Sequence, residues 1–138
     1  MKINLLFIYL SFFICCSQND EPWKKNQLIE PSDLNKIISS QNQLPHIISV
    51  GPGQVISGSI GIGECRYDRN LTNFENHLSS FSKDSEIIIY CGCCPFKDCP
   101  NIRPAFSLLN SLGYKNHKLL NIRNNIKTDW IDMNYLTD

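Results

Sequence analysis

The sequence predicts an α/β fold in which a central, mainly parallel sheet is flanked by helices. Three observations support this prediction. The chain has 138 residues, a length typical of one domain. Short runs of β-branched apolar residues alternate with segments whose apolar residues recur at helical spacing, as in α/β proteins. The strongest run, residues 86–90, is continuously apolar after Glu86, which is typical of a parallel strand buried on both faces.

The first residues have the features of an export signal. An apolar run at residues 3–14 follows Lys2, has the length of a signal-peptide core, and ends at Cys15 and Cys16 before a polar stretch. A hydrophobic run closed by cysteine resembles the lipobox of bacterial lipoproteins. This resemblance implies a signal peptide at residues 1–15 and lipidation of Cys16. The alternative is an uncleaved N-terminal anchor helix.

Both interpretations place the protein outside the cytoplasm on a membrane. We therefore expect an exported, membrane-anchored lipoprotein, either periplasmic or at the cell surface. Residues 16–30 are polar and contain Pro22, so they are predicted to form a lipid-anchored tether. The folded domain is then expected to span residues 31–138.

The first half of this domain is predicted to contain a helix, a strand and a second helix. Ser32 is placed to cap a short helix that carries Leu34, Ile37 and Ile38 at helical spacing. Residues 47–50 form a β-branched run that stops at a Gly-Pro-Gly turn, which indicates a strand. Apolar residues then share one helical face, at positions 71, 74, 78 and 81.

After the buried strand at residues 86–90, the pattern predicts three more elements. A helix is marked by the apolar residues between Ile102 and Leu112 and closed by Gly113. Pro104 lies in its first turn if Asn101 is the cap, where a missing N–H costs little. Residues 118–122 are predicted to form the last strand and residues 126–131 a short helix.

The chemistry of the chain is concentrated in a loop rich in cysteine. Of seven cysteines, four lie within the nine residues from Cys91 to Cys99, between the buried strand and the next helix. Ligands of open parallel sheets gather beyond the carboxyl ends of the strands, and a helix N-terminus favours an anion such as a thiolate. A cysteine pKa is commonly lowered in this setting, from about 8.5 toward roughly 4 to 7. Lys97 and Arg103 add positive charge nearby, so we expect an activated thiol.

Three segments resemble the rhodanese family of sulfurtransferases. The buried strand ending in Tyr90-Cys91, the Ala-Phe-Ser-Leu-Leu segment at residues 105–109 and Leu112-Gly113-Tyr114 are similar to the rhodanese active-site strand, loop and helix. The strand at residues 47–50 and the Gly-Ser-Ile at 58–60 resemble the family's first buried strand and its Gly-His-Ile-Pro element. The resemblance covers roughly residues 31–135 and implies a rhodanese-like three-layer fold.

The resemblance implies a specific chemistry for the loop. Rhodanese-like domains carry sulfane sulfur on one cysteine as a persulfide and pass it to a thiophilic acceptor. Carried over by position, the nucleophile is Cys91, with Cys94 and Cys99 as alternatives, and Lys97 and Arg103 would bind the substrate. The implied partners are a small sulfur donor and a thiol acceptor, and no cofactor is implied. The loop is longer than is usual for the family.

A second hypothesis is a non-catalytic thiol or disulfide protein. Nearby cysteines often pair outside the cytoplasm, so Cys93 or Cys94 is a candidate to bridge to Cys99 and hold the loop together. If Cys16 is lipidated and Cys15 is removed, five cysteines remain, and full pairing would leave one thiol free.

A third hypothesis is a soft-metal-binding lipoprotein that uses the same loop. Four thiols within nine residues resemble a ligand set for zinc or copper(I). However, the spacing lacks the two separated pairs of a zinc ribbon and the loop contains no histidine, so no metal ligand is assigned. A formal net charge of zero, without a clustered basic face, argues against nucleic-acid binding. The sequence does not indicate an oligomeric state.

Overall fold

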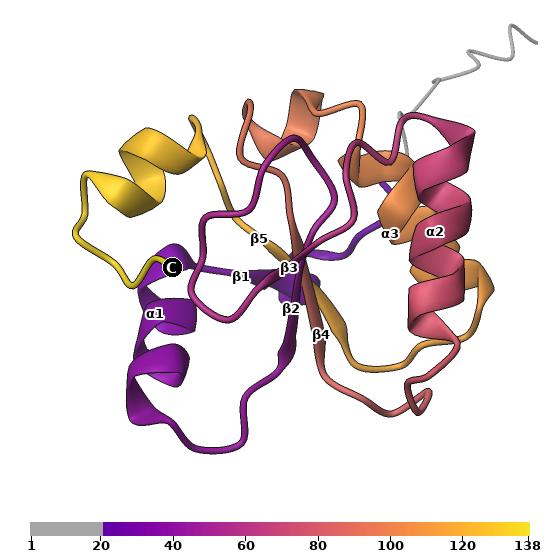
Figure 1. Cartoon of the computed structure of the whole chain (residues 1–138), viewed down its shortest axis with the longest axis horizontal. Coiled ribbons are helices and arrows are strands. Elements are labelled where there is room, and N and C mark those ends of the chain that lie inside the picture. Colours follow the sequence, from indigo (N-terminus) through magenta and orange to yellow (C-terminus); the bar gives the residue numbers. More distant parts are fainter. Residues whose placement is uncertain (1–20) are drawn as a thin grey trace, which may run out of the picture.

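The computed structural model describes residues 21–138, so the predicted leader and Cys16 lie outside the described residues. Its centre is a parallel five-stranded sheet in the order β1-β5-β4-β2-β3 (Figure 1). The strands are, in chain order, β1 (Leu28–Ile29), β2 (His46–Ser49), β3 (Ile60–Gly61), β4 (Ile87–Tyr90) and β5 (His117–Leu120). β4 therefore lies in the middle of the sheet, as its continuous apolar run predicts.

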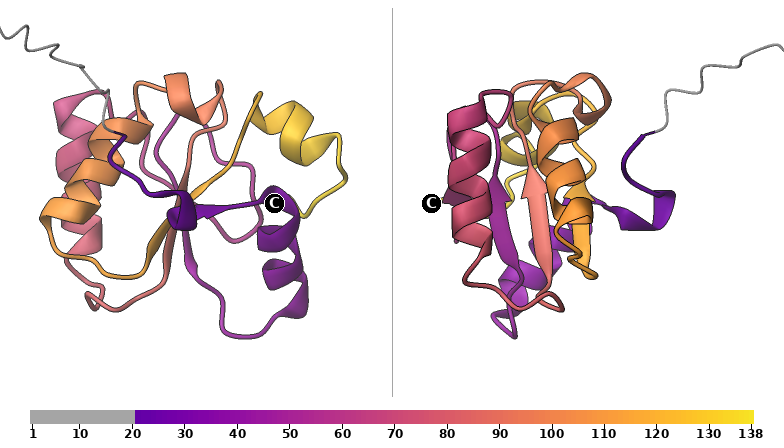
Figure 2. Two further views of the ribbon diagram at one scale, coloured as in Figure 1. Left: turned by 180° about the vertical axis from the view of Figure 1, so that it is seen from behind. Right: turned by 90° about the vertical axis from the view of Figure 1, so that its right-hand side faces the viewer.

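Helices cover both faces of the sheet and make three layers (Figure 2). The helices α2 (Asp68–Leu78) and α3 (Ile102–Ser111) pack on one face. The helix α1 (Pro31–Ser40) and the single-turn π-helix η3 (Lys127–Ile131) pack on the other. The fold is thus the predicted three-layer α/β fold with a parallel sheet.

The alternation of side chains along β4 explains why both faces are covered. Ile87 and Ile89 lie in the core beneath α2 and α3, whereas Ile88 and Tyr90 lie in the core beneath α1 and η3. Successive side chains of a strand point to opposite faces, so four buried residues in a row require a layer on each side.

Element boundaries differ slightly from those predicted. α1 begins at Pro31 with Glu30 as the N-cap, so Ser32 does not cap the helix. Proline is well suited to the first helical position, because the N–H it lacks has no partner there. α2 begins at Asp68 and ends at Leu78, so Phe81 lies beyond the helix. These shifts do not change which residues face the core.

The segment before α1 is part of the fold, which corrects the prediction of a tether extending to residue 30. Leu28 and Ile29 pair with β5 as the edge strand β1. Trp23 is 5% exposed, and its ring contacts those of Phe96 and Phe106, with centroids 5.6 and 5.8 Å apart. Pattern reasoning missed this packing because a lone tryptophan in a polar stretch has no periodicity. No helix among residues 21–138 is long and apolar enough to cross a membrane.

Candidate functional site: the cysteine loop

The cysteine loop lies at the carboxyl edge of the sheet, where the chain leaves its central strand. Cys91 directly follows β4, and Gly51 follows the neighbouring strand β2. The two residues are in close contact, because a Cβ added to Gly51 would lie 2.2 Å from the Cys91 sulfur. Gly51, expected only as a turn residue, therefore makes room for the Cys91 side chain.

Three of the four loop sulfurs converge on one point. The Sγ atoms of Cys91, Cys93 and Cys99 all lie within 4.8 Å of one another. The Cys91 and Cys93 sulfurs are 3.3 Å apart, and the Cys93 and Cys94 sulfurs are 3.1 Å apart. We call Cys91, Cys93 and Cys99 the sulfur cluster.

The members of the cluster differ in exposure. Cys91 and Cys99 are buried, each 1% exposed, whereas Cys93 is exposed and Cys94 is intermediate. All four thiols are free, so the possible bridges from Cys93 or Cys94 to Cys99 are not formed in this structure. The predicted nucleophile, Cys91, is thus buried, and Cys93 is the member of the cluster that solvent reaches.

The expectation of a lowered pKa for Cys91 is wrong in this structure. The pKa of the Cys91 thiol is raised well above its usual range, first by a hydrogen bond to the Cys99 side chain and second by burial. A backbone N–H of Cys93 donates to the Cys91 sulfur and opposes this shift without cancelling it. Burial and a hydrogen bond to Cys93 raise the pKa of Cys94 to about 11. The Cys91 and Cys94 thiols are therefore held protonated near neutral pH.

Two N–H groups donate hydrogen bonds toward the Cys91 sulfur, and the sequence indicated neither. One is the Cys93 backbone N–H. The other is the side-chain Nδ2 of Asn101, 3.6 Å away. Asn101 is the N-cap residue of α3, as expected, but its side chain makes no capping hydrogen bond, and its Oδ1 accepts from the backbone N–H of Arg66. Such donors favour negative charge on the sulfur once its proton has left.

Lys97 and Arg103 lie over aromatic rings. The Lys97 Nζ lies 6.0 Å from the centre of the Phe96 ring, and the Arg103 guanidinium lies 5.2 Å from that of Trp23. The two predicted substrate-binding cations thus lie over two neighbouring rings, those of Phe96 and Trp23, on the outer side of the loop. Their placement there is favoured by cation–π attraction.

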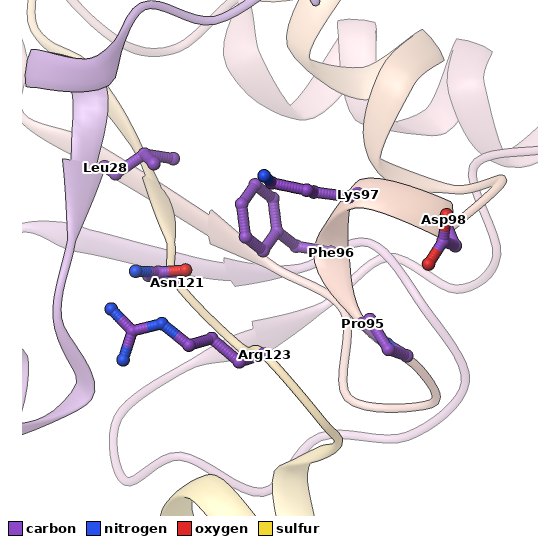
Figure 3. A pocket seen from close by; sticks show the side chains of 7 residues that line it. All are labelled: Leu28, Pro95, Phe96, Lys97, Asp98, Asn121 and Arg123. Carbon is purple, nitrogen blue, oxygen red and sulfur yellow. The ribbon is translucent and has the colours of Figure 1, made fainter.

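A pocket of about 460 Å³ adjoins this outer side (Figure 3). It lies between β1, the end of β5 and the short 3-10 helix η2 (Phe96–Asp98) within the loop. Lys97 and Arg123 line it, but Arg123 is already paired with Glu30 at 2.9 Å. No cysteine is among its lining residues, so the pocket and the sulfur cluster are separate features of the described chain.

Two buried serines beside the site, Ser49 and Ser59, have structural roles. The Ser49 hydroxyl donates to the carbonyl of Gly53 at 2.6 Å. Ser59, in place of the family's histidine, contacts the Tyr90 hydroxyl at 2.9 Å. The Tyr90 oxygen also accepts from the backbone N–H groups of Val55 and Ile56. These bonds fix the loop after β2 to the end of β4 and so position the base of the site.

Comparison with solved structures gives this architecture its name. The chain is similar to a rhodanese-like domain of a protein from Anabaena sp., whose structure was determined by solution NMR, with a TM-score of 0.58 and 14% identity over 81% of this chain and 78% of that one. The fold is rhodanese-like. No protein-family model and no curated protein matches the sequence. At this identity the likeness concerns the fold, and the chemistry has to be argued from the residues.

Within this rhodanese-like fold, the cysteine loop joins the central strand to α3. The first loop residue, Cys91, lies beyond the carboxyl end of β4, where parallel sheets place their functional groups. The four thiols of the loop are its candidate nucleophiles and soft-metal ligands. The arrangement thus offers a buried sulfur that accepts hydrogen bonds and an exposed sulfur in contact with it.

Proposed function

We propose that the protein is a rhodanese-like sulfurtransferase that carries sulfane sulfur as a persulfide on Cys91. The observation that supports this most is the position of Cys91, directly after the central strand of a rhodanese-like fold. The donors toward its sulfur, the Cys93 N–H and the Asn101 amide, add support because a persulfide is an anion at neutral pH. Cys94 and Cys99 are the alternative nucleophiles.

The reaction has two sulfur-transfer steps. The Cys91 thiol loses its proton to solvent, and the thiolate attacks the outer sulfur of thiosulfate or a polysulfide. The sulfur–sulfur bond of the donor breaks, and sulfite or a shortened polysulfide leaves with the bonding electrons. An acceptor thiolate or cyanide then attacks the outer sulfur of the persulfide and releases the Cys91 thiolate. The sulfane sulfur changes partner twice, and no external oxidant is needed.

The burial of Cys91 determines how a donor would reach it. Cys93 is the exposed member of the cluster, so we expect the donor to approach from the Cys93 side. Gly92, between the two, is packed against Ile126: a Cβ added there would lie 2.8 Å from the Ile126 Cβ. The loop therefore has little free space around Cys91, and turnover is expected to be slow until the loop opens.

The test compares two variants that each lose an equally buried thiol. Thiocyanate formation from thiosulfate or polysulfide and cyanide is measured for Cys91→Ala and for Cys65→Ala, both of whose cysteines are 1% exposed. The proposal predicts a fall of more than about a hundredfold in rate for Cys91→Ala, as is typical when a nucleophile is removed. Cys65→Ala should stay within about threefold of the parent rate. Equal rates in the two variants would contradict the proposal.

A further inference from the structure

Cys91, Cys93 and Cys99 form a candidate metal centre made of sulfur alone. All three sulfurs lie within 4.8 Å of one another. With metal–sulfur bonds of about 2.3 Å, three sulfurs around one ion lie roughly 4 Å apart, so small movements of these side chains suffice. The thiols belong to a loop fixed at both ends, because β4 precedes Cys91 and α3 begins three residues after Cys99.

The composition of the cluster selects the type of ion. It offers no imidazole or carboxylate ligand, and thiolates without such partners favour Cu(I), zinc or iron–sulfur clusters. Structural zinc is almost always bound by four ligands. The fourth loop thiol, Cys94, is not a member of the converging group, although its sulfur is 3.1 Å from that of Cys93. A set of three thiolates therefore favours Cu(I) over zinc.

The surroundings of the cluster resemble the support that metal sites commonly have. The Asn101 amide donates toward the Cys91 sulfur, as does the Cys93 backbone N–H. The positive end of α3, a ten-residue helix, lies just beyond Cys99. Hydrogen bonds of this kind orient ligands and offset the charge that several thiolates bring together. Burial of Cys91 and Cys99 would keep solvent from the bound ion.

From this geometry we propose that Cys91, Cys93 and Cys99 bind one Cu(I) ion through their three sulfurs. Binding replaces three S–H bonds by copper–sulfur bonds and releases the protons to solvent, so no electron is transferred. The proposal is independent of sulfur transfer, although bound copper would occupy the sulfur that carries the persulfide. Copper and sulfane sulfur would then compete for the Cys91 sulfur.

The experiment is an anaerobic Cu(I) titration of the reduced protein in competition with the chelator bathocuproine disulfonate, with no sulfur donor present. One equivalent is expected to bind. Cys93→Ser, at the exposed position, and Cys99→Ser should each weaken Cu(I) binding by more than about tenfold, because even loss of a group that only supports a ligand typically costs about 10- to 100-fold. Cys94→Ser and Cys65→Ala should bind like the parent chain, and copper-edge X-ray absorption should show three sulfur neighbours.

Three results would overturn this site. The parent chain fails to compete with the chelator for Cu(I), Cys93→Ser binds as tightly as the parent, or Cys94→Ser weakens binding as much as Cys93→Ser. The last would assign a four-thiolate site, for which a zinc titration of the same variants gives the ligand set. Circular dichroism of each variant separates loss of ligands from loss of fold. Thiocyanate formation by metal-free protein does not depend on copper, so failure here leaves the sulfurtransferase proposal standing.

Discussion

The thiol of Cys91 is protonated at neutral pH, and this determines how its reactivity depends on pH. Its pKa is raised by the Cys99 hydrogen bond and by burial, so the thiolate is a small fraction throughout the neutral range. Below the pKa of a thiol, each pH unit increases its thiolate fraction about tenfold. An activated rhodanese-type thiolate would instead be fully formed and insensitive to pH.

We therefore predict that the alkylation rate of Cys91 rises about tenfold per pH unit from about pH 7 to about pH 10, without a plateau. The rate is measured by mass spectrometry of the modified loop after iodoacetamide pulses. Cys99→Ala, which removes the first cause of the raised pKa, should react faster than the parent chain at every pH below the parent pKa. A plateau below about pH 8 in the parent chain would show that the thiol is activated after all.

Gly51 allows two neighbouring loops to meet, and its replacement tests how tightly the site is packed. Gly51→Ala would place a Cβ 2.2 Å from the Cys91 sulfur, so one of the two loops has to move. Overpacking of this kind destabilises a protein by about 1–3 kcal/mol. We expect a loss of this size in urea unfolding, together with slower sulfur uptake.

Gly61→Ala is the matched control. Its Cβ would lie 3.2 Å from the Gln54 Oε1, the far end of a flexible side chain, and the substitution should cost less than about 1 kcal/mol. If the two variants have the same stability, the close packing of Gly51 against Cys91 is not a feature of the folded protein in solution.

Strands and helices were predictable from local pattern, whereas the details of the site were not. The β-branched run of β4 by itself predicts a strand, and the apolar face of α2 by itself predicts a helix. The alternation of strands and helices along the chain predicts the parallel sheet. The proximity of the loop cysteines follows from nine residues of sequence. The hydrogen bond that the Cys91 thiol donates to the Cys99 sulfur, which raises the Cys91 pKa, depends on side-chain orientation, which no sequence pattern encodes. The contact of Arg103 depends on Trp23, a residue distant in the chain.

Trp23 ties the N-terminal segment to the folded domain. Its ring packs on Phe96 in the cysteine loop and on Phe106 in α3. It is therefore part of the core, although it precedes the predicted start of the domain at residue 31. Truncation of a buried aromatic residue to alanine typically costs about 3–5 kcal/mol. We expect Trp23→Ala to lower the free energy of unfolding by about this amount, measured by urea denaturation.

Lys25→Ala, at an exposed position two residues further along, should change the unfolding free energy by less than about 0.5 kcal/mol. A fragment beginning at Pro31 loses both Trp23 and the edge strand β1, and should be less stable than Trp23→Ala. Equal stability of this fragment and the parent chain would restore the tether interpretation of residues 21–30.

The measurement that tests the sulfur-carrying role of Cys91 most directly is peptide-level mass spectrometry of the reduced, metal-free protein after thiosulfate or polysulfide treatment. Trypsin gives a peptide of residues 84–97 with Cys91, Cys93 and Cys94, and Cys99 falls in the next one. We predict a gain of about 32 Da, one sulfur atom, that fragment ions assign to Cys91 and that reductant removes. A gain only on Cys94 or Cys99 would keep the chemistry and contradict the residue, and no gain on any cysteine would contradict sulfur transfer itself.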